Sequence, residues 1–193
     1  MNAVNEKPVS GEQFDFYIMT FEKLLGNIPL SNNDESAFLF QMIENAITSA
    51  KIKKLELEGL TDDELNKYVD SRDAQMANNL IWYKKRHPDA KIIVWIANMH
   101  AGKRLSSIRY KGEDPLRYTK FTVFGEHIVN EYSSSVFSMA FTSSRGNSKM
   151  PYNFEGIEEI LINAPNASLE KELDDKKIDF GFINFNKIKQ EHP

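Results

Sequence analysis

Residues 91–97 have the sequence KIIVWIA, in which apolar side chains follow one another without alternating polar residues. A strand of a parallel sheet that is covered on both faces has such a continuous apolar run. The segment is therefore predicted to be a buried strand, followed directly by Asn98, Met99 and His100. Ligands of open α/β sheets bind beyond the carboxyl ends of the strands, so a site is expected where this strand ends.

Two amphipathic helices are predicted in the N-terminal third of the chain. The first has apolar residues at helical spacing over residues 14–25, with Gly26 as its C-terminal stop. The second follows a turn at residues 31–33 and has an apolar stripe that ends at Ala50. Both helices are expected to pack their apolar faces in the core.

A third, longer helix is predicted to begin at Thr61, because Thr61 and Glu64 have the spacing of a capping box, and to end before Pro88. The spacing of its apolar residues places Arg72 in the middle of the inward face. A buried guanidinium without partners is costly, so we expect Arg72 to be buried against a partner. That partner is either an acid such as Asp73 or Glu58, in a purely structural pair, or an anionic substrate.

The rest of the chain is predicted to alternate strands and short helices. Strands are expected at residues 121–123, 136–142, 160–163 and 178–182, helices at residues 128–132 and after Ser168, and a loop at residues 143–153. These elements predict an α/β fold in which helices flank a largely parallel central sheet, after a helical N-terminal third. One domain is expected over residues 1–193, with residues 1–11 flexible.

The composition argues against several classes of partner and cofactor. The chain has 24 Lys and Arg residues against 28 Asp and Glu residues and no long basic run, so nucleic acid is not expected as a partner. It has no cysteine, and its four histidines lack the close spacing of metal ligands, so no metal or other cofactor is expected. The N-terminus carries no apolar run, so no membrane association and, by default, a cytoplasmic location are expected.

Three polar residues are candidates for a site near the end of the 91–97 strand. His100 is expected to bind substrate or to act as an acid or base, and the alternative is a histidine that only bonds a nearby carbonyl. Asn98 either binds substrate or holds the loop after the strand. His127, beside Glu126 and Gly125, either lines the same cleft or is an exposed helical residue.

Three groups of residues resemble the erythromycin esterase family, in the order in which that family has them. They are Arg72-Asp73, Met76-Ala77, Asn78 and Trp82 in the third helix; the strand end Trp95-Ile96-Ala97-Asn98-Met99-His100; and Phe124-Gly125 with the segments 136–141 and 167–170. The first two groups together are fairly specific, whereas the third alone is not. The resemblance covers roughly residues 14–185.

This resemblance implies a partial erythromycin-esterase-like fold and a function. The implied reaction is water-mediated hydrolysis of an ester, such as a macrolide lactone, without a serine or cysteine nucleophile. A histidine is the general base, because imidazole exchanges a proton near neutral pH. His100 is then the catalytic candidate, and Arg72, Asn98 and His127 are candidates to bind a small-molecule ester or an anionic ligand.

The sequence departs from the family pattern at two points. Ala97 stands where the strand-end motif has its first histidine, and a methyl group neither accepts a proton nor forms hydrogen bonds. An N-terminal family segment with a glycine-glutamate pair and a histidine has no counterpart before His87. We therefore expect a hydrolase domain that is incomplete or inactive alone, and the alternative is a non-catalytic binding or interaction domain. A sheet that lacks strands also predicts self-association or a partner that completes it.

Overall fold

A computed structural model describes residues 10–28, 34–59, 61–109, 118–149 and 159–185. The chain forms two compact units, residues 1–138 and residues 139–193. The prediction of one domain over residues 1–193 stays a prediction. The predicted flexible segment at the N-terminus lies outside the described residues up to residue 9, and the first helix begins at Gly11.

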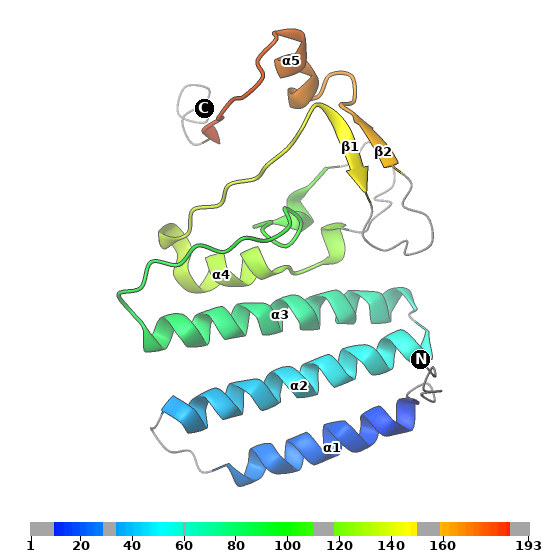
Figure 1. Cartoon of the computed structure of the whole chain (residues 1–193), viewed down its shortest axis with the longest axis vertical. Coiled ribbons are helices and arrows are strands. Elements are labelled where there is room, and N and C mark those ends of the chain that lie inside the picture. The colour runs from blue at the N-terminus through cyan, green and yellow to red at the C-terminus, as the bar shows by residue number, and fades with distance from the viewer. Residues whose placement is uncertain (1–9, 29–33, 60, 110–117, 150–158, 186–193) are drawn as a thin grey trace, which may run out of the picture. The chain divides into compact units, whose positions relative to one another are not determined.

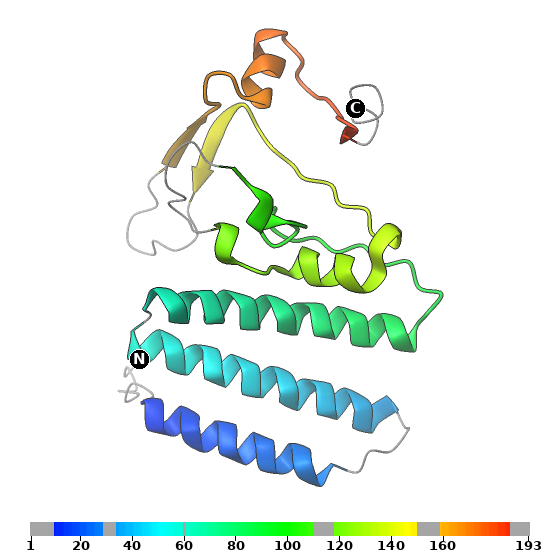
Figure 2. The same cartoon turned by 180° about the vertical axis from the view of Figure 1, so that it is seen from behind.

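Four α-helices build the first unit. They are α1 (Gly11–Asn27), α2 (Asp34–Glu58), α3 (Asp62–Arg86) and α4 (Phe124–Tyr132). The helices α1, α2 and α3 lie side by side in chain order, and α4 packs on α3, as both views of the chain show (Figure 1, Figure 2). The prediction of three helices in this part of the chain is confirmed. Gly26 lies inside the last turn of α1 and not beyond it, because the helix continues to Asn27.

The helix α3 begins and ends as the sequence predicts. The side chain of Thr61 accepts a hydrogen bond from the backbone N–H of Glu64 at 3.4 Å, and the backbone N–H of Thr61 donates to Glu64 Oε2 at 2.8 Å. This reciprocal capping box satisfies two N–H groups that a helix start otherwise leaves without partners. The helix ends at Arg86, and its C-cap residue, His87, stands directly before Pro88, as expected from the geometry of the residue before a proline.

Polar side chains fill part of the interface between α2 and α3. Asn79 Oδ1 accepts hydrogen bonds from Gln41 Nε2 at 2.7 Å, from Gln75 Nε2 at 3.0 Å and from Asn45 Nδ2 at 3.2 Å. Asn79 Nδ2 donates back to Asn45 Oδ1 at 2.9 Å, and Thr48 donates to Gln75 Oε1 at 3.0 Å. Because Gln41 is buried, a sliding of one helix along the other would leave these amides without partners. The network therefore fixes the register of the two helices.

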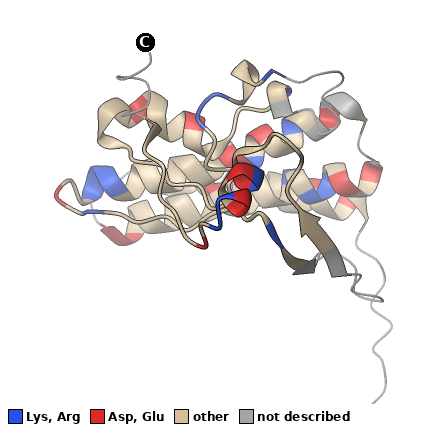
Figure 3. Ribbon diagram, turned by 90° about the horizontal axis from the view of Figure 1, so that it is seen from above, with Lys and Arg blue, Asp and Glu red and all other residues tan. Residues whose placement is uncertain are grey.

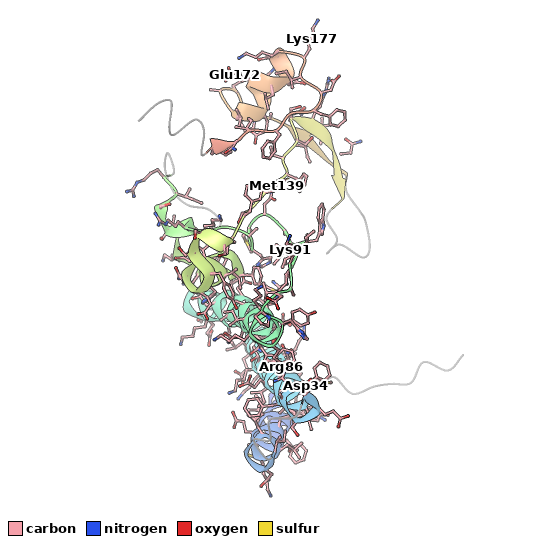
Figure 4. The ribbon with its side chains drawn as sticks, turned by 90° about the vertical axis from the view of Figure 1, so that its left-hand side faces the viewer. Asp34, Arg86, Lys91, Met139, Glu172 and Lys177 are labelled. Carbon is pink, nitrogen blue, oxygen red and sulfur yellow. The ribbon has the colours of Figure 1, made fainter. Side chains whose placement is uncertain are left out.

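Ion pairs join the helix ends at the surface of the first unit. Lys54 pairs with Asp15 at 2.7 Å between α2 and α1. Arg86, at the end of α3, pairs with Asp34, at the start of α2, and stacks 5.4 Å from the ring centre of Trp82 (Figure 4). Exposed pairs of this kind contribute only about 0–1 kcal/mol each, so packing and the amide network contribute more to the association of the helices.

Two apolar clusters form the core around α3. The Ala77 cluster joins α3 to α4 and consists of buried Ala77, Phe124 and Ile128 with Met76, Leu80, Ile81, Ile96, Tyr132 and Val136 packed against them. The Val123 cluster consists of buried Leu105, Phe121 and Val123 with Val69 and Met99 packed against them. Leu105 belongs to a short 3-10 helix, Leu105–Ser107, and two more such helices are Tyr118–Lys120 and Ser133–Ser135.

The prediction of a largely parallel central sheet is wrong. Residues 91–97 form neither a strand nor a helix, and Ile93 and Trp95 are 95% and 85% exposed. Only Ile96 of this run packs against the Ala77 cluster. The predicted strands at residues 121–123, 136–142 and 178–182 are likewise not strands. Within the described ranges, the first unit is helical and the only sheet has two antiparallel strands, in the second unit.

The second unit contains this sheet and a short helix. The strands β1 (Arg145–Lys149) and β2 (Glu159–Asn163) pair antiparallel, with Arg145 opposite Asn163. The strand β2 was predicted, whereas β1 lies in the predicted loop. The helix α5 (Leu169–Asp175) is capped by Ser168 as expected, because the Ser168 hydroxyl accepts from Lys171 N at 3.1 Å. The helix α5 carries four acidic residues, Glu170, Glu172, Asp174 and Asp175, and one basic residue, Lys171, which are red and blue in Figure 3.

None of the helices in the described ranges combines the length and the apolar character that a membrane crossing requires.

Candidate functional site

The buried face of α3 carries a charged residue between the two apolar clusters. Val69, Asp73 and Ala77 follow one another at four-residue spacing, and Asp73 is 0% exposed. The prediction that Arg72 is buried is therefore wrong, because the adjacent Asp73 takes the inward position and Arg72 is exposed. The site forms around Asp73.

Asp73 caps a helix that comes later in the chain. Its Oδ2 accepts a hydrogen bond from the backbone N–H of Phe124, the first residue of α4, at 2.9 Å. The residue before that helix, Val123, has no side chain that could serve as a cap. The partial positive charge of the α4 N-terminus and this hydrogen bond both stabilise a carboxylate at this position. A buried Asp73 is thus compatible with the apolar clusters on either side.

Asp70 anchors the same segment one turn earlier on α3. Its Oδ1 accepts a hydrogen bond from the backbone N–H of Thr122 at 2.8 Å. Asp70 and Asp73 are three residues apart and so lie on one face of the helix, where they hold the chain before α4 by alternate backbone N–H groups. Neither residue was predicted as a site residue from the sequence, although Asp73 is part of the family-like helix motif.

His100 lies in a tight turn that packs on the start of α4. The backbone N–H of Ala101 donates to Ala97 O at 3.2 Å, which closes the turn. The carbonyl of His100 accepts from the backbone N–H of Gly125 at 2.7 Å, which attaches the turn to α4. A Cβ at position 125 would lie 2.4 Å from Gly102 O and 2.5 Å from Ala101 O, so only glycine permits this approach. The backbone at position 125 therefore helps to place the imidazole.

The imidazole of His100 lies between the buried carboxylate of Asp73 and the exposed guanidinium of Arg72. Its Nδ1 lies 2.8 Å from Asp73 Oδ2, and its Nε2 lies 3.1 Å from Arg72 Nη1. Because a guanidinium only donates hydrogen bonds, Nε2 must accept, and the ring proton is assigned to Nδ1, which donates to Asp73. The side chain of His100 is 12% exposed, so solvent reaches its edge while Asp73 is closed off.

The two oxygens of the Asp73 carboxylate differ in their hydrogen bonding. Asp73 Oδ1 is buried and accepts no hydrogen bond from any residue in the described ranges, whereas Oδ2 accepts two. An unsatisfied buried acceptor costs free energy. Within the described ranges, this cost offsets part of the stabilisation that the two hydrogen bonds at Oδ2 provide.

Arg72 also influences a tyrosine on the α2 side of the helix. Burial raises the pKa of Tyr68, and the hydrogen bond of Tyr68 with Glu56 raises it further, while the positive charge of Arg72 opposes both. The pKa of Glu56 is lowered, mainly by its hydrogen bond with Lys53. The guanidinium of Arg72 thus lies in a polar setting that includes the His100 ring and Tyr68.

The other two predicted site residues, Asn98 and His127, lie in the His100 turn and on α4. Asn98 is exposed in the turn two residues before His100. His127 is half-buried on α4, and its Nε2 is buried without a hydrogen-bond partner among the described residues. No described hydrogen bond joins His127 to His100. Of the predicted residues, the structure brings Arg72 and His100 into contact, and substrate binding by Asn98 and His127 stays a prediction.

The arrangement of Asp73 and His100 is suited to proton transfer. A histidine that donates Nδ1–H to a carboxylate is held in one tautomer and orientation, and the carboxylate stabilises the imidazolium that forms when Nε2 takes a proton. Among the described residues, no group of three or more His, Asp or Glu side chains has the geometry to hold a metal ion. The chemistry that this geometry supports directly is acid–base chemistry at Nε2 of His100.

Comparison with known proteins agrees with the motifs around this site. The family model of erythromycin esterase matches residues 25–193, which include α3, the His100 turn and α4. No curated protein and no solved structure matches the chain. The matched range covers most of the sequence. The chain therefore belongs to the erythromycin esterase family.

Proposed function

We propose that the chain supplies the acid–base centre for water-mediated hydrolysis of a small-molecule ester, with His100 as the general base and Asp73 as its positioning residue. The observation that carries the proposal is the 2.8 Å contact between His100 Nδ1 and the buried Asp73 Oδ2. This contact leaves Nε2 as the nitrogen that takes a proton from water. Membership of an esterase family supports ester hydrolysis as the reaction.

The proposed reaction needs no covalent bond between enzyme and substrate. Nε2 of His100 takes a proton from water while the water oxygen forms a bond to the ester carbonyl carbon. The tetrahedral intermediate then breaks its bond to the alcohol oxygen, and the proton on Nε2 passes to that leaving oxygen. Acid and alcohol are the products, and the imidazole returns to its neutral state. Asp73 stays a carboxylate throughout and stabilises the imidazolium between the two steps.

The remaining candidates have supporting roles in this proposal. Arg72 is assigned to binding a substrate group beside the base, and its contact with the same imidazole and its exposure support this assignment. Asn98 and His127 are assigned to substrate binding, Asn98 because it lies in the His100 turn and His127 because its buried Nε2 is open to a hydrogen bond. Ala97, at the start of the turn, offers no polar group. We therefore expect slow turnover by this chain alone.

The proposal is tested by measuring the hydrolysis of activated aryl esters through the phenol that they release. Macrolides are assayed in parallel. His100→Gln should reduce the second-order rate constant by about 100-fold or more, which is the usual contribution of a general base. His87→Gln is the matched control, because His87 is an exposed histidine at the end of α3, outside the site. Equal hydrolysis by the wild-type protein and the His100 variant would remove His100 from the mechanism.

A second candidate function is ligand binding without turnover. The observation in its favour is the contact of Arg72 Nη1 with His100 Nε2, because this contact occupies the lone pair that a general base needs. A thermal-shift screen with esters and anionic small molecules separates the two functions, since a ligand that binds only the native state raises the melting temperature even without turnover. Shifts that depend on Arg72 and His100, together with no hydrolysis, would favour this second function.

A further inference from the structure

We propose that Arg72 blocks His100 in the unliganded protein and that a carboxylate on the substrate releases it. The preferred substrates are then esters that also carry a carboxylate, such as half-esters of dicarboxylic acids. This inference rests on the proposed function for the role of His100 as the base. It adds the class of substrate and a reason why the base acts only when that substrate is bound.

The block follows from the hydrogen bonds of the imidazole. A neutral imidazole has one N–H and one lone pair. Asp73 Oδ2 accepts the Nδ1–H at 2.8 Å, and Arg72 Nη1 donates toward the Nε2 lone pair at 3.1 Å. A lone pair that accepts from a guanidinium is not available to take a proton from water. Arg72 must therefore leave Nε2 before His100 can act as the base.

A carboxylate is the group best able to move Arg72. The planar guanidinium matches a carboxylate in a two-bond arrangement, and such charge-assisted hydrogen bonds are roughly twice as strong as neutral ones. The neutral imidazole nitrogen offers a single bond, and so does the carbonyl oxygen of an uncharged ester. An ester without an acid group therefore gains little by displacing Arg72 from His100.

The surroundings of Arg72 allow this exchange. Arg72 is exposed, so a dissolved anion reaches it and its long side chain can turn away from His100. The nearest carboxylate in sequence, Asp73, is fully buried and its Oδ2 already accepts from Phe124 and His100. Among the described residues, no carboxylate forms an ion pair with Arg72. Among the described residues, the imidazole of His100 is therefore the group with which an external carboxylate competes for Arg72.

Nitrogen-15 NMR of the four histidines during a titration with sodium propionate tests the inference without any ester. The His100 signals are assigned by their absence in His100→Gln. In the unliganded protein we expect the tautomer with the proton on Nδ1 and an Nε2 that accepts a hydrogen bond. Propionate should shift the His100 Nε2 signal in a saturable manner, and sodium chloride at the same ionic strength should not.

Three variants show whether the response passes through Arg72. Arg72→Gln should weaken the apparent affinity for propionate by about tenfold or more, as expected for loss of a charged hydrogen-bond partner. Arg109→Gln removes the same charge from another exposed arginine and should leave the titration unchanged. Arg72→Lys, which keeps the charge but loses the planar fork, should bind propionate more weakly than the wild type.

The outcomes separate this inference from the proposed function. A saturable, Arg72-dependent shift of His100 supports the carboxylate site even if no ester is hydrolysed, in which case only the proposed function fails. The inference is overturned if the unliganded protein has the proton of His100 on Nε2, or if propionate shifts His100 equally in the wild type and in Arg72→Gln. It is also overturned if hydrolysis is found and aryl half-esters of glutaric acid react no faster than their neutral methyl esters.

Discussion

The imidazole Nδ1 of His100 lies 2.8 Å from Oδ2 of Asp73, a carboxylate that is fully buried between two apolar clusters on α3. The same oxygen accepts the first backbone N–H of α4. Asp73 Oδ2 thus joins α3, to which it belongs, to the His100 turn and to α4. Changes at Asp73 should therefore alter the stability of the unit and the state of the imidazole together.

Asp73→Asn keeps the shape of the side chain and removes its charge. The amide oxygen at the position of Oδ2 can still accept from Phe124 N and His100 Nδ1, but it carries no charge, and the amide NH2 then takes the buried position of Oδ1, which has no hydrogen-bond partner among the described residues. We expect a loss of about 1–3 kcal/mol in the free energy of unfolding, the usual cost of a buried group without a partner. The measurement is urea denaturation followed by circular dichroism.

Asp70→Asn is the matched control for this change. Asp70 accepts one backbone N–H, from Thr122, and is half-buried, so its amide oxygen can keep that bond. Asp70→Asn should therefore lower the free energy of unfolding less than Asp73→Asn does, and it should leave the tautomer of His100 unchanged. Equal losses in the two variants would show that the junction at Asp73 has no special role.

Gly125→Ala tests the close approach of the His100 turn to α4. The added methyl group would lie 2.4 Å from Gly102 O and 2.5 Å from Ala101 O, both backbone atoms, so the turn must move away from the helix. We expect a loss of more than about 1 kcal/mol in stability, as for overpacking in a well-packed core, and a displaced His100 signal in NMR spectra.

Gly26→Ala provides the opposite expectation for the same substitution. Gly26 lies in α1, and a Cβ there meets no atom within 4 Å. Alanine is favoured over glycine in a helix by about 0.5–1 kcal/mol, so this variant should be more stable than the wild type. If both alanine variants changed stability in the same direction, the steric argument for Gly125 would be wrong.

The helices of the first unit were predictable from local sequence, but the conformation of residues 91–97 was not. The capping box of Thr61 and Glu64 and the stop before Pro88 are local signals, and they located α3 correctly. The apolar run at residues 91–97 indicates burial on both faces only if neighbouring strands cover it. In the structure Ile96 packs inward and Ile93 is 95% exposed, so the run has one packed side. Pairing with distant strands is a tertiary property that the run itself does not contain.

The sequence singled out Arg72 and His100, which lie in contact, but it placed α3 in the wrong phase. The end of the 91–97 run pointed to His100, and Arg72 Nη1 lies 3.1 Å from its Nε2. The average apolar spacing placed Arg72 inward, one residue away from the true buried face. Asp73 is buried because Phe124 N and His100 Nδ1, both distant in sequence, donate to it. Apolar periodicity carries no information on such donors.

Acid should weaken the start of α3 through Glu64. Its hydrogen bonds with the side chain and the backbone of Thr61 hold the pKa of the Glu64 carboxyl below its ordinary value of 4.5. A lowered pKa in the folded state means that the stabilisation is complete above the unfolded pKa and is lost as the pH falls through the folded value. The urea midpoint of the wild type should therefore fall more steeply below about pH 4.5 than that of Glu64→Gln. Parallel pH profiles of the two proteins would contradict this assignment.

Asn79→Ala should cost more stability than any other single change in the amide network between α2 and α3. Asn79 accepts from Gln41, Asn45 and Gln75 and donates to Asn45, so its removal leaves several part-buried amides without partners at once. Each buried unsatisfied group costs about 1–3 kcal/mol, and we expect a total loss of about 2–4 kcal/mol because water and side-chain rotation relieve part of it. A double-mutant cycle with Asn45→Ala should give a coupling energy of about 1 kcal/mol or more, measured by urea denaturation. Additive effects of the two substitutions would mean that the network does not hold the helices in register and that apolar packing alone does so.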